Sequence, residues 1–337
     1  MTEMTVLNGV AIEELLTIPM AVEAVEQAYL EKSKGDAALW PMVFHEFDPG
    51  HADLDIKSGD LGGLGFYGLK VVSWFGANPG KGLPALYGTS LLFDLATGAP
   101  RALLNAGPIT DFRTGAAGAI GAKYLARPDA ETLLMAGTGA LAPYLIAATL
   151  YLLPQIKTVY VTNPHHPECS AAACEAITPQ VEKLLSGCGG CHAAIAAAPD
   201  LEKAVRHSDV ILTATPAREP FIKAEWVQPG THISCVGADM SGKQEVDSAL
   251  FASAKVFGDD TAQCLSVGEC EVPYKAGVFS GHICEIGGVI SGAEAGRTDA
   301  SDITIFDSTG IALQDIATAA ALLQAAQETG KGQTVRL

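Results

Sequence analysis

The sequence predicts an α/β protein with two domains: a doubly wound parallel sheet with helices on both faces, and a second domain built on an antiparallel or mixed sheet. Three observations lead to this prediction. Strand-like and helical runs alternate between residues 132 and 236, as expected for parallel strands joined by helices. Short runs broken by turn residues fill residues 41–104. The 337 residues also exceed the ~250–300 at which one hydrophobic core usually stops growing.

The first part of the chain should contain an amphipathic helix followed by the mixed sheet. Residues 18–34 repeat apolar side chains at the spacing of one helical face. Strand-like runs follow, among them 68–74 and 89–94. An Ala-rich stretch without proline over 114–126 predicts a helix that leads into the second domain.

The second part alternates strand and helix. Strands are expected at residues 132–136, 158–162, 193–197, 210–214 and 231–236. Helices are expected at residues 142–153, 167–185 and 200–207. The last predicted element is an Ala-rich helix over 311–328, with no strand after it.

Composition excludes several classes of protein. The formal net charge of −17 repels phosphate backbones, so nucleic acid is not an expected partner. The longest apolar stretch, near residues 145–153, is too short for the ~20 residues of a membrane-spanning helix. Acidic residues at Glu3, Glu13 and Glu14 are unlike a secretory signal, so we expect a cytoplasmic protein with reduced cysteines.

No metal site is expected. The segment Cys188-Gly-Gly-Cys191-His192 has the spacing of half a zinc site, but no second pair of ligands follows it. The histidines show no metal-ligand spacing either. A Gly-rich loop entering a strand is the simpler interpretation, and the lack of a G-x-S-x-G elbow gives no support to serine hydrolase chemistry.

A glycine-rich turn predicts a dinucleotide site. The strand at 132–136 runs into Gly137-Thr138-Gly139-Ala140-Leu141-Ala142 and then into a helical run. The first glycine permits a tight turn, the second allows close approach of a pyrophosphate, and the alanine lets the helix pack on the strand. The order strand, turn, helix, strand makes this interpretation stronger than the motif alone.

The choice between the two nicotinamide cofactors stays open. The tip of the next strand reads Thr162-Asn163-Pro164-His165-His166, with neither the acidic residue that binds a ribose hydroxyl nor the arginine that binds a 2′-phosphate. Asn163 can bond a ribose hydroxyl, whereas a protonated His165 or His166 favours a phosphate. We therefore expect NAD(H) or NADP(H).

Nine segments in order resemble the ornithine cyclodeaminase and μ-crystallin family, which includes ketimine reductases and alanine dehydrogenases. They cover most of the chain and are Gly68-Leu-Lys70-Val-Val, Asn78-Pro-Gly-Lys-Gly-Leu-Pro84, Asp94-Leu-Ala-Thr-Gly98, Ile109-Thr-Asp-Phe-Arg113-Thr-Gly-Ala-Ala, Leu125-Ala-Arg-Pro-Asp129, Gly137-Thr-Gly139, Pro229-Gly-Thr-His, Val236-Gly-Ala-Asp239 and Thr304-Ile-Phe-Asp-Ser308-Thr-Gly310-Ile-Ala-Leu-Gln-Asp315.

The resemblance implies how the two domains are connected. Residues 1–114 with 311–337 would form a substrate-binding and dimerisation domain, and residues 115–310 a Rossmann dinucleotide-binding domain inserted into it. That arrangement would account for the last helix, which returns to the first domain. Members of this family usually form homodimers, so the resemblance implies a homodimer here.

The resemblance also implies residue roles. Lys70 matches the lysine at the reacting centre, and Arg113 matches the arginine that binds the substrate carboxylate; a guanidinium suits a two-point carboxylate contact and an ammonium can protonate or polarise the group at the α-carbon. Asp239 matches the acid/base residue facing the α-nitrogen. Further expected cofactor contacts come from Thr213, Thr215, Val236, Ser308 and Gly310.

Two departures from the family pattern affect the substrate. Many members carry an arginine shortly after the proline matching Pro41, and this chain lacks it. Lys57, in a segment like one found in some relatives, is the expected replacement carboxylate ligand, with a plain surface lysine as the alternative. In cyclodeaminases, an acidic residue and a methionine flank the substrate on the strand that precedes the one matching Lys70. We do not find that segment in this sequence.

We therefore expect an NAD(P)-dependent oxidoreductase that transfers a hydride to or from the α-carbon of a small L-amino or imino acid, as an imine reductase or amino-acid dehydrogenase. One alternative is ornithine cyclodeaminase, which converts ornithine to proline with loss of ammonia. The other is a non-catalytic, μ-crystallin-like binder of small molecules, although retention of Lys70, Arg113 and Asp239 together argues against it.

Overall fold

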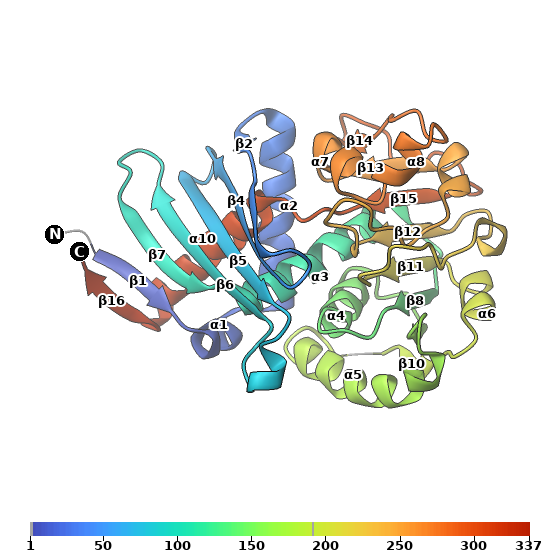
Figure 1. Ribbon diagram of the computed structural model, residues 1–337, viewed down its shortest axis with the longest axis horizontal. Coiled ribbons are helices and arrows are strands. Elements are labelled where there is room, and N and C mark those ends of the chain that lie inside the picture. Colours follow the sequence, from blue (N-terminus) through green and yellow to red (C-terminus); the bar gives the residue numbers. More distant parts are fainter. Residues whose placement is uncertain (1–2, 191) are drawn as a thin grey trace. The chain divides into compact units, whose positions relative to one another are not determined.

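The computed structural model describes residues 3–190 and 192–337, and the chain forms two compact units (Figure 1). The first unit comprises Met1–Arg113 and Ile311–Leu337, and the second comprises Thr114–Gly310. Each unit is built on its own sheet. Cys191 lies outside the described residues, so the Cys188–His192 segment is not placed as a whole.

The first unit contains the N-terminal elements and the C-terminal helix and strand. Its elements are β1 (Glu3–Leu7), α1 (Gly9–Leu15), α2 (Ile18–Lys34), β2 (Ala37–Leu39), β3 (Val43–Asp48), β4 (Ala52–Leu61), β5 (Phe66–Phe75), a 3₁₀ turn at Pro79–Lys81, β6 (Leu86–Asp94), β7 (Pro100–Asn105), the start of α3 (Ala106–Leu125), α10 (Ala312–Thr329) and β16 (Gln333–Arg336).

The sheet of the first unit is mixed, as predicted. Its order is β16-β1-β7-β6-β5-β4-β2, with β3 also paired to β4. Helix α10 lies against the strands β4 to β6 and against α2 (Figure 1). The approach is close because glycines face the helix: a Cβ at Gly59 would lie 3.1 Å from Leu313, and one at Gly68 would lie 3.4 Å from Ile316.

Local signals account for the ends of these helices. Thr17 caps α2 through its hydroxyl, and Gly35 ends the helix with φ of +78°. Helix α3 begins at Ala106 rather than 114, where Asn105 accepts a hydrogen bond from the Gly107 N–H. The expectation that no strand follows the last helix was wrong. Strand β16 pairs with β1. The short run at 333–336 carries no local signal of this long-range pairing.

The second unit contains the alternating elements. They are β8 (Thr132–Ala136), α4 (Ala142–Leu152), β9 (Thr158–Thr162), a 3₁₀ turn at Pro167–Cys169, α5 (Ser170–Leu185), β10 (Ala194–Ala197), α6 (Leu201–Arg206), β11 (Val210–Thr213), a 3₁₀ turn at Ala224–Trp226, β12 (His232–Cys235), a 3₁₀ turn at Ser248–Ala252, β13 (Lys255–Gly258), α7 (Thr261–Ser266), α8 (Glu271–Lys275), β14 (Cys284–Glu285), α9 (Ile286–Ser291) and β15 (Thr304–Asp307).

These strands form a parallel sheet in the order β10-β9-β8-β11-β12-β15-β13-β14. The reversal of order at β8 is the topological switch point near which open α/β sheets bind ligands. Strands β11, β12 and β15 are buried along their whole length, and β8 is buried except at Thr132, as expected for parallel strands covered on both faces. Strands β13 to β15 have no predicted counterpart, because they are short and lie between irregular segments. Among the described residues, no helix is long and apolar enough to cross a membrane.

Candidate functional site

The glycine-rich turn joins β8 to α4 at the carboxyl edge of the parallel sheet. Gly137 has φ of +132°, and a Cβ there would lie 2.5 Å from the Ala214 carbonyl oxygen, so the position requires glycine. A Cβ at Gly139 would meet no atom within 4 Å. Open space above this glycine, at the start of an 11-residue helix, fits a pyrophosphate approached by backbone N–H groups.

Asn163 ties the tip of β9 to this turn. Its Nδ2 donates to the Thr138 hydroxyl at 3.0 Å, while its Oδ1 accepts from the N–H groups of His165 and His166 at 3.1 and 2.9 Å. The carboxamide oxygen is therefore used within the loop. One Nδ2 hydrogen remains for a ribose hydroxyl, so the expected contact of Asn163 with a cofactor stays a prediction.

Thr213 ends β11 and Thr215 lies just after it, and both bind a buried carboxylate. The Thr213 hydroxyl donates to Glu245 Oε2 at 2.6 Å, and the Thr215 hydroxyl donates to Glu245 Oε1 at 2.8 Å. Thr213 is 0% exposed, and its expected contact with a cofactor stays a prediction. Thr215 and Val236 retain 8% exposure, and their roles stay predictions.

The turn after β15 is held by a second buried carboxylate. Asp259 accepts from the Gly310 N–H at 2.9 Å and from the Thr309 hydroxyl at 2.8 Å, and it lies 3.5 Å from the Ser308 hydroxyl. Burial raises the pKa of Asp259, and these donors oppose the rise. The backbone of Ser308 and Gly310 is therefore fixed before any ligand binds.

Asp239 lies in the loop after β12 and is exposed on half of its side chain. Lys243 pairs with it at 2.5 Å between Nζ and Oδ1. The loop leaves the carboxyl edge of the parallel sheet, where residues in open α/β folds contact ligands. An exposed carboxylate at this edge is accessible to a substrate nitrogen, as its expected acid/base role requires.

In the first unit, Lys70 is buried beside a carboxylate. It projects from β5, is 3% exposed, and its Nζ lies 3.0 Å from Asp315 Oδ1 on α10 and 3.4 Å from the Thr110 hydroxyl on α3. Burial lowers the pKa of Lys70 to about 8; Asp315 opposes this shift, and the neighbouring Arg113 and Lys57 add to it. A primary amine with this pKa can exchange a proton near neutral pH.

Arg113 shares the same carboxylate. Its Nε lies 3.3 Å from Asp315 Oδ1, and its Nη1 donates to Gln314 Oε1 at 2.9 Å. Gln314 is itself held by the Tyr29 hydroxyl at 2.8 Å. Burial alone would raise the pKa of Asp315, but Lys70 and Arg113 hold that pKa below its ordinary value. Two cations therefore face one anion.

Lys57 lies directly across the β4–β5 ladder from Lys70. Directly opposed residues in an antiparallel pair project from the same face, ~5 Å apart at Cβ. Lys57 is partly buried, unlike a plain surface lysine. Its expected contact with a substrate carboxylate stays a prediction.

Sequence reasoning missed the three buried carboxylates that organise these groups, Asp315, Glu245 and Asp259. Asp315 sits in the last quoted family segment, but no role was drawn for it, although an aspartate within an apolar helix signals a buried partner. Glu245 follows a polar turn and carries no such pattern. Only the structure shows that Glu245 reaches the ends of β11 and β12.

A parallel sheet with a glycine-rich turn at its switch point, together with a buried lysine and arginine, defines a dinucleotide-binding fold with an amino-acid-type substrate site. The chain belongs to the ornithine cyclodeaminase/mu-crystallin family, whose model matches residues 2–330.

Individual relatives cover nearly the whole chain. Alanine dehydrogenase of Archaeoglobus fulgidus is 35% identical over 99% of this chain and 98% of its own length. The structure of iminosuccinate reductase of Paracoccus denitrificans in complex with NAD⁺ has a TM-score of 0.89 and 31% identity, covering 99% of this chain and 100% of its own. That of Thermococcus litoralis Δ¹-pyrroline-2-carboxylate reductase with NADH and L-proline has a TM-score of 0.86 and 31% identity, covering 98% and 100%.

Proposed function

We propose that this protein is an NAD(H)-dependent oxidoreductase that transfers a hydride to or from the α-carbon of a small L-amino or imino acid. The observation that carries the proposal is the sharing of one buried carboxylate, Asp315, by Lys70 and Arg113. The side chains of Lys70, Arg113 and Asp315 are all buried, and together they carry more positive than negative charge. An anionic substrate supplies the missing charge, and the amine of Lys70 is then placed to act on the adjoining carbon or nitrogen.

Each residue has a role in this proposal. Arg113, fixed by Gln314, binds the substrate carboxylate, with Lys57 as a second cationic contact. Lys70 polarises or protonates the group at the α-carbon. Asp239 exchanges a proton with the α-nitrogen as the carbon–nitrogen bond changes order. In the reductive direction, the α-carbon gains a hydride and the nitrogen gains a proton.

The second unit is proposed to hold the dinucleotide. Relatives crystallised with NAD⁺ or NADH support this assignment, and the open space at Gly139 supports the pyrophosphate position. When bound, the nicotinamide supplies or accepts the hydride. The backbone of residues 137–141 would carry the phosphates, and Asn163, Thr215, Val236, Ser308 and Gly310 would orient the sugar and ring. The tip of β9 leaves NADP(H) as a second possibility.

We also propose a homodimer. An archaeal alanine dehydrogenase, similar at a TM-score of 0.86, was solved as a dimer with NAD. In this chain, the face of the first sheet that points away from α10 carries apolar side chains, because residues alternate with those that face the helix. These include Ile56, Val71, and the exposed Val43 and Tyr87. An apolar sheet face of this kind favours burial against a second copy.

One observation favours ornithine cyclodeaminase as a second candidate. Asp55 lies on β4 two residues from Lys57 and therefore on the same sheet face. The sequence did not identify an acidic residue of this kind on the strand before Lys70, whereas the register now places one there. A carboxylate at this position can receive the δ-ammonium of ornithine, although Lys57 repels it.

A substrate panel tests the proposal. The full-length protein is mixed with NADH or NADPH and with pyruvate, glyoxylate or oxaloacetate plus ammonia or methylamine, or with a cyclic ketimine, and absorbance of the reduced cofactor is followed. We expect cofactor consumption that is strongly reduced, to a residual measurable rate, in Lys70→Ala and Asp239→Asn.

Other outcomes have defined meanings. Proline and ammonia formed from L-ornithine without net cofactor change, and lost in Asp55→Asn, would assign cyclodeaminase activity instead. Tight NADH binding without turnover of any substrate would indicate the non-catalytic binder.

A further inference from the structure

Glu245 receives four hydrogen bonds from two adjacent turns. Oε1 accepts from the N–H and the hydroxyl of Thr215 at 2.7 and 2.8 Å, and Oε2 accepts from the Thr213 hydroxyl at 2.6 Å and the Gly237 N–H at 3.0 Å. The side chain is 0% exposed. It therefore joins the turn after β11 to the turn after β12, and its two oxygens are saturated with donors.

These turns pack closely, because glycines stand where a side chain would clash with the neighbouring turn. A Cβ at Gly237 would lie 2.3 Å from the Thr215 carbonyl oxygen and 2.6 Å from the Glu245 carboxyl. A Cβ at Gly137 would lie 2.5 Å from the Ala214 carbonyl oxygen. The turn of the proposed dinucleotide site, the β11 turn and the β12 turn are thus stacked in order along β8, β11 and β12. The carboxylate fastens the last two.

The neighbouring Glu269 holds the backbone at Glu245. Its Oε1 accepts from the N–H groups of Glu245 and Val246 at 2.8 and 2.6 Å. Burial first, and the charge of Glu245 second, raise the pKa of Glu269 well above its ordinary value. Burial raises the pKa of Glu245 to about 7, but its four donors oppose the rise. Glu269 therefore holds the backbone at Glu245 and Val246, next to the four donors that hold the Glu245 carboxyl group.

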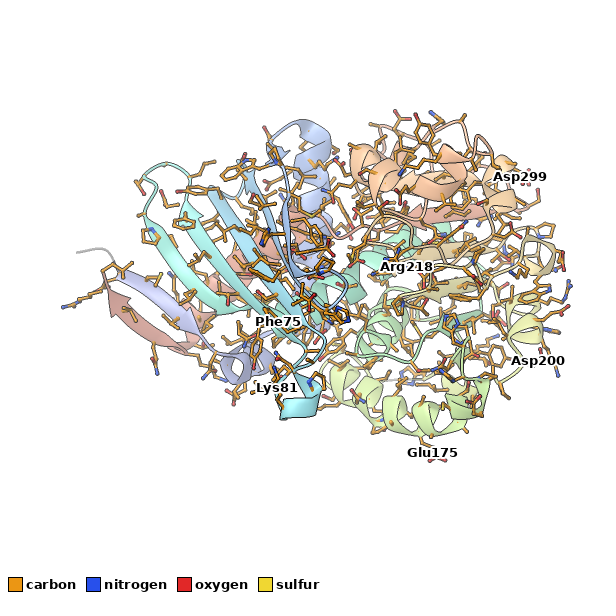
Figure 2. The ribbon with its side chains drawn as sticks, viewed as in Figure 1. Phe75, Lys81, Glu175, Asp200, Arg218 and Asp299 are labelled. Carbon is orange, nitrogen blue, oxygen red and sulfur yellow. The ribbon has the colours of Figure 1, made fainter. Side chains whose placement is uncertain are left out.

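The far end of the Asp239 loop has its own anchor. Glu271 is 1% exposed and accepts from the Ser241 hydroxyl at 2.5 Å and the Gly242 N–H at 2.7 Å. Arg218, labelled in Figure 2, donates from Nη1 to the Ser241 carbonyl oxygen at 3.1 Å. The loop from Gly237 to Gly242 is therefore held at both ends, with Asp239 between the anchors.

We propose that Glu245 is a positioning residue that sets Asp239 for proton transfer and sets the β11 turn for the dinucleotide, with Glu271 holding the far end of the Asp239 loop. The inference rests on the proposed function only for the role of Asp239. Among the described residues, no group of three His, Cys, Asp or Glu side chains is arranged to bind a metal.

The test compares Glu245→Gln with Glu31→Gln in the full-length protein. Both replace a buried glutamate with a side chain of the same size, but Glu31 lies on α2 in the first unit and makes none of the hydrogen bonds of these turns. In Glu245→Gln, an amide N–H must face the Gly237 N–H or the Thr215 N–H, so one turn is released. We expect kcat to fall at least tenfold and the Kd for NADH, measured by fluorescence, to rise at least fivefold.

Two further readouts separate positioning from general damage. The KM for the amino or keto acid should change less than twofold, because the Lys70 and Arg113 site is untouched. In an Asp239→Asn background, Glu245→Gln should lower kcat by less than twofold more, because Glu245 acts through Asp239. Equal kcat losses in both backgrounds, or an unchanged kcat and NADH affinity, would overturn the proposal.

The test still decides the proposal if Glu245→Gln does not fold or if the wild-type protein shows no turnover. If Glu245→Gln does not fold, Thr213→Val removes one donor at constant shape and should raise the Kd for NADH two- to fivefold; no change would refute the proposal. If the wild-type protein turns over no substrate, the proposed function fails by itself. The NADH affinities of Glu245→Gln and Glu31→Gln then decide the positioning role.

Discussion

In the first unit, the buried charges around Lys70 have both signs and sit in direct ion pairs, with Asp315 between Lys70 and Arg113. In the second unit, the buried carboxyl groups of Glu245, Glu269, Asp259 and Asp307 are held by backbone N–H, hydroxyl and thiol groups. The first arrangement leaves positive charge for an anionic ligand. The second cross-links the turns at the carboxyl edge of a sheet. Buried charge is thus proposed to attract substrate in one unit, whereas it fixes backbone in the other.

The strongest test of the first unit is Lys70→Ala. Removing a group that protonates or polarises the reacting centre should lower kcat/KM by about 10²- to 10⁴-fold. NADH affinity should stay within twofold, since the proposed dinucleotide site lies in the second unit. Steady-state kinetics and fluorescence titration measure the two quantities. A loss below tenfold would remove Lys70 from the chemistry.

Asp315→Ala should destabilise the first unit. The change leaves Lys70 and Arg113 buried without their anion, and breaking a buried pair costs about 3–5 kcal/mol. Urea unfolding followed by circular dichroism measures the change in the free energy of unfolding. A matched Asp299→Ala change, at an exposed loop position of the second unit, should cost less than ~1 kcal/mol. Equal costs would contradict the account of buried charge.

Arg113→Lys should impair substrate binding more than catalysis. A lysine keeps the charge but loses the planar pair of donors that a carboxylate binds. A charge-assisted hydrogen bond is worth about 1.5–3 kcal/mol, so we expect KM for the keto or amino acid to rise roughly ten- to a hundredfold. Initial-rate kinetics across substrate concentration provide the measurement. An unchanged KM would place the carboxylate elsewhere, with Lys57 as the next residue to replace.

The pH dependence of reduction should report Lys70. Burial lowers its pKa to about 8, so the ammonium is present below that pH and is lost as pH rises through it. For a step that needs the ammonium, kcat/KM should be level below about 8 and fall tenfold per unit above it. Asp315→Asn should move the break to lower pH, because Asp315 raises the pKa of Lys70. A break that stays in place would exclude Lys70 as the titrating group.

The smallest expected effect comes from the buried glutamates of the second unit, Glu269 and Glu245. Burial raises the pKa of Glu269 well above its ordinary value, so Glu269→Gln should change the free energy of unfolding by less than ~1 kcal/mol. Glu245→Gln turns an amide N–H toward one of four donors and should cost about 1–3 kcal/mol. Urea titrations of the two variants in parallel give the comparison. The reverse order would contradict this ranking of the two glutamates.

The elements with strong local signals could be predicted from the sequence. Strands β8 and β9 and helix α2 match their predicted limits, because a continuous buried run or a helical apolar period is readable in one segment. Strands β13 to β16 were not found, since their pairing depends on partners far along the chain. The same division holds for the candidate site: Lys70, Arg113 and Asp239 came from motifs, whereas the contact of Thr213 with Glu245 depends on a residue 32 positions away and could not be read from either segment.

By itself, the sequence determined the fold class, the dinucleotide turn and the family to which the chain belongs, because glycine spacing and apolar periodicity are local properties. The tertiary structure alone decided which charges are buried together. Asp315 meets Lys70 across 245 residues, and Glu245 meets Thr213 across 32. The pKa values and ion pairs of these groups depend on burial and distance, and both arise only when the sheets close over their helices.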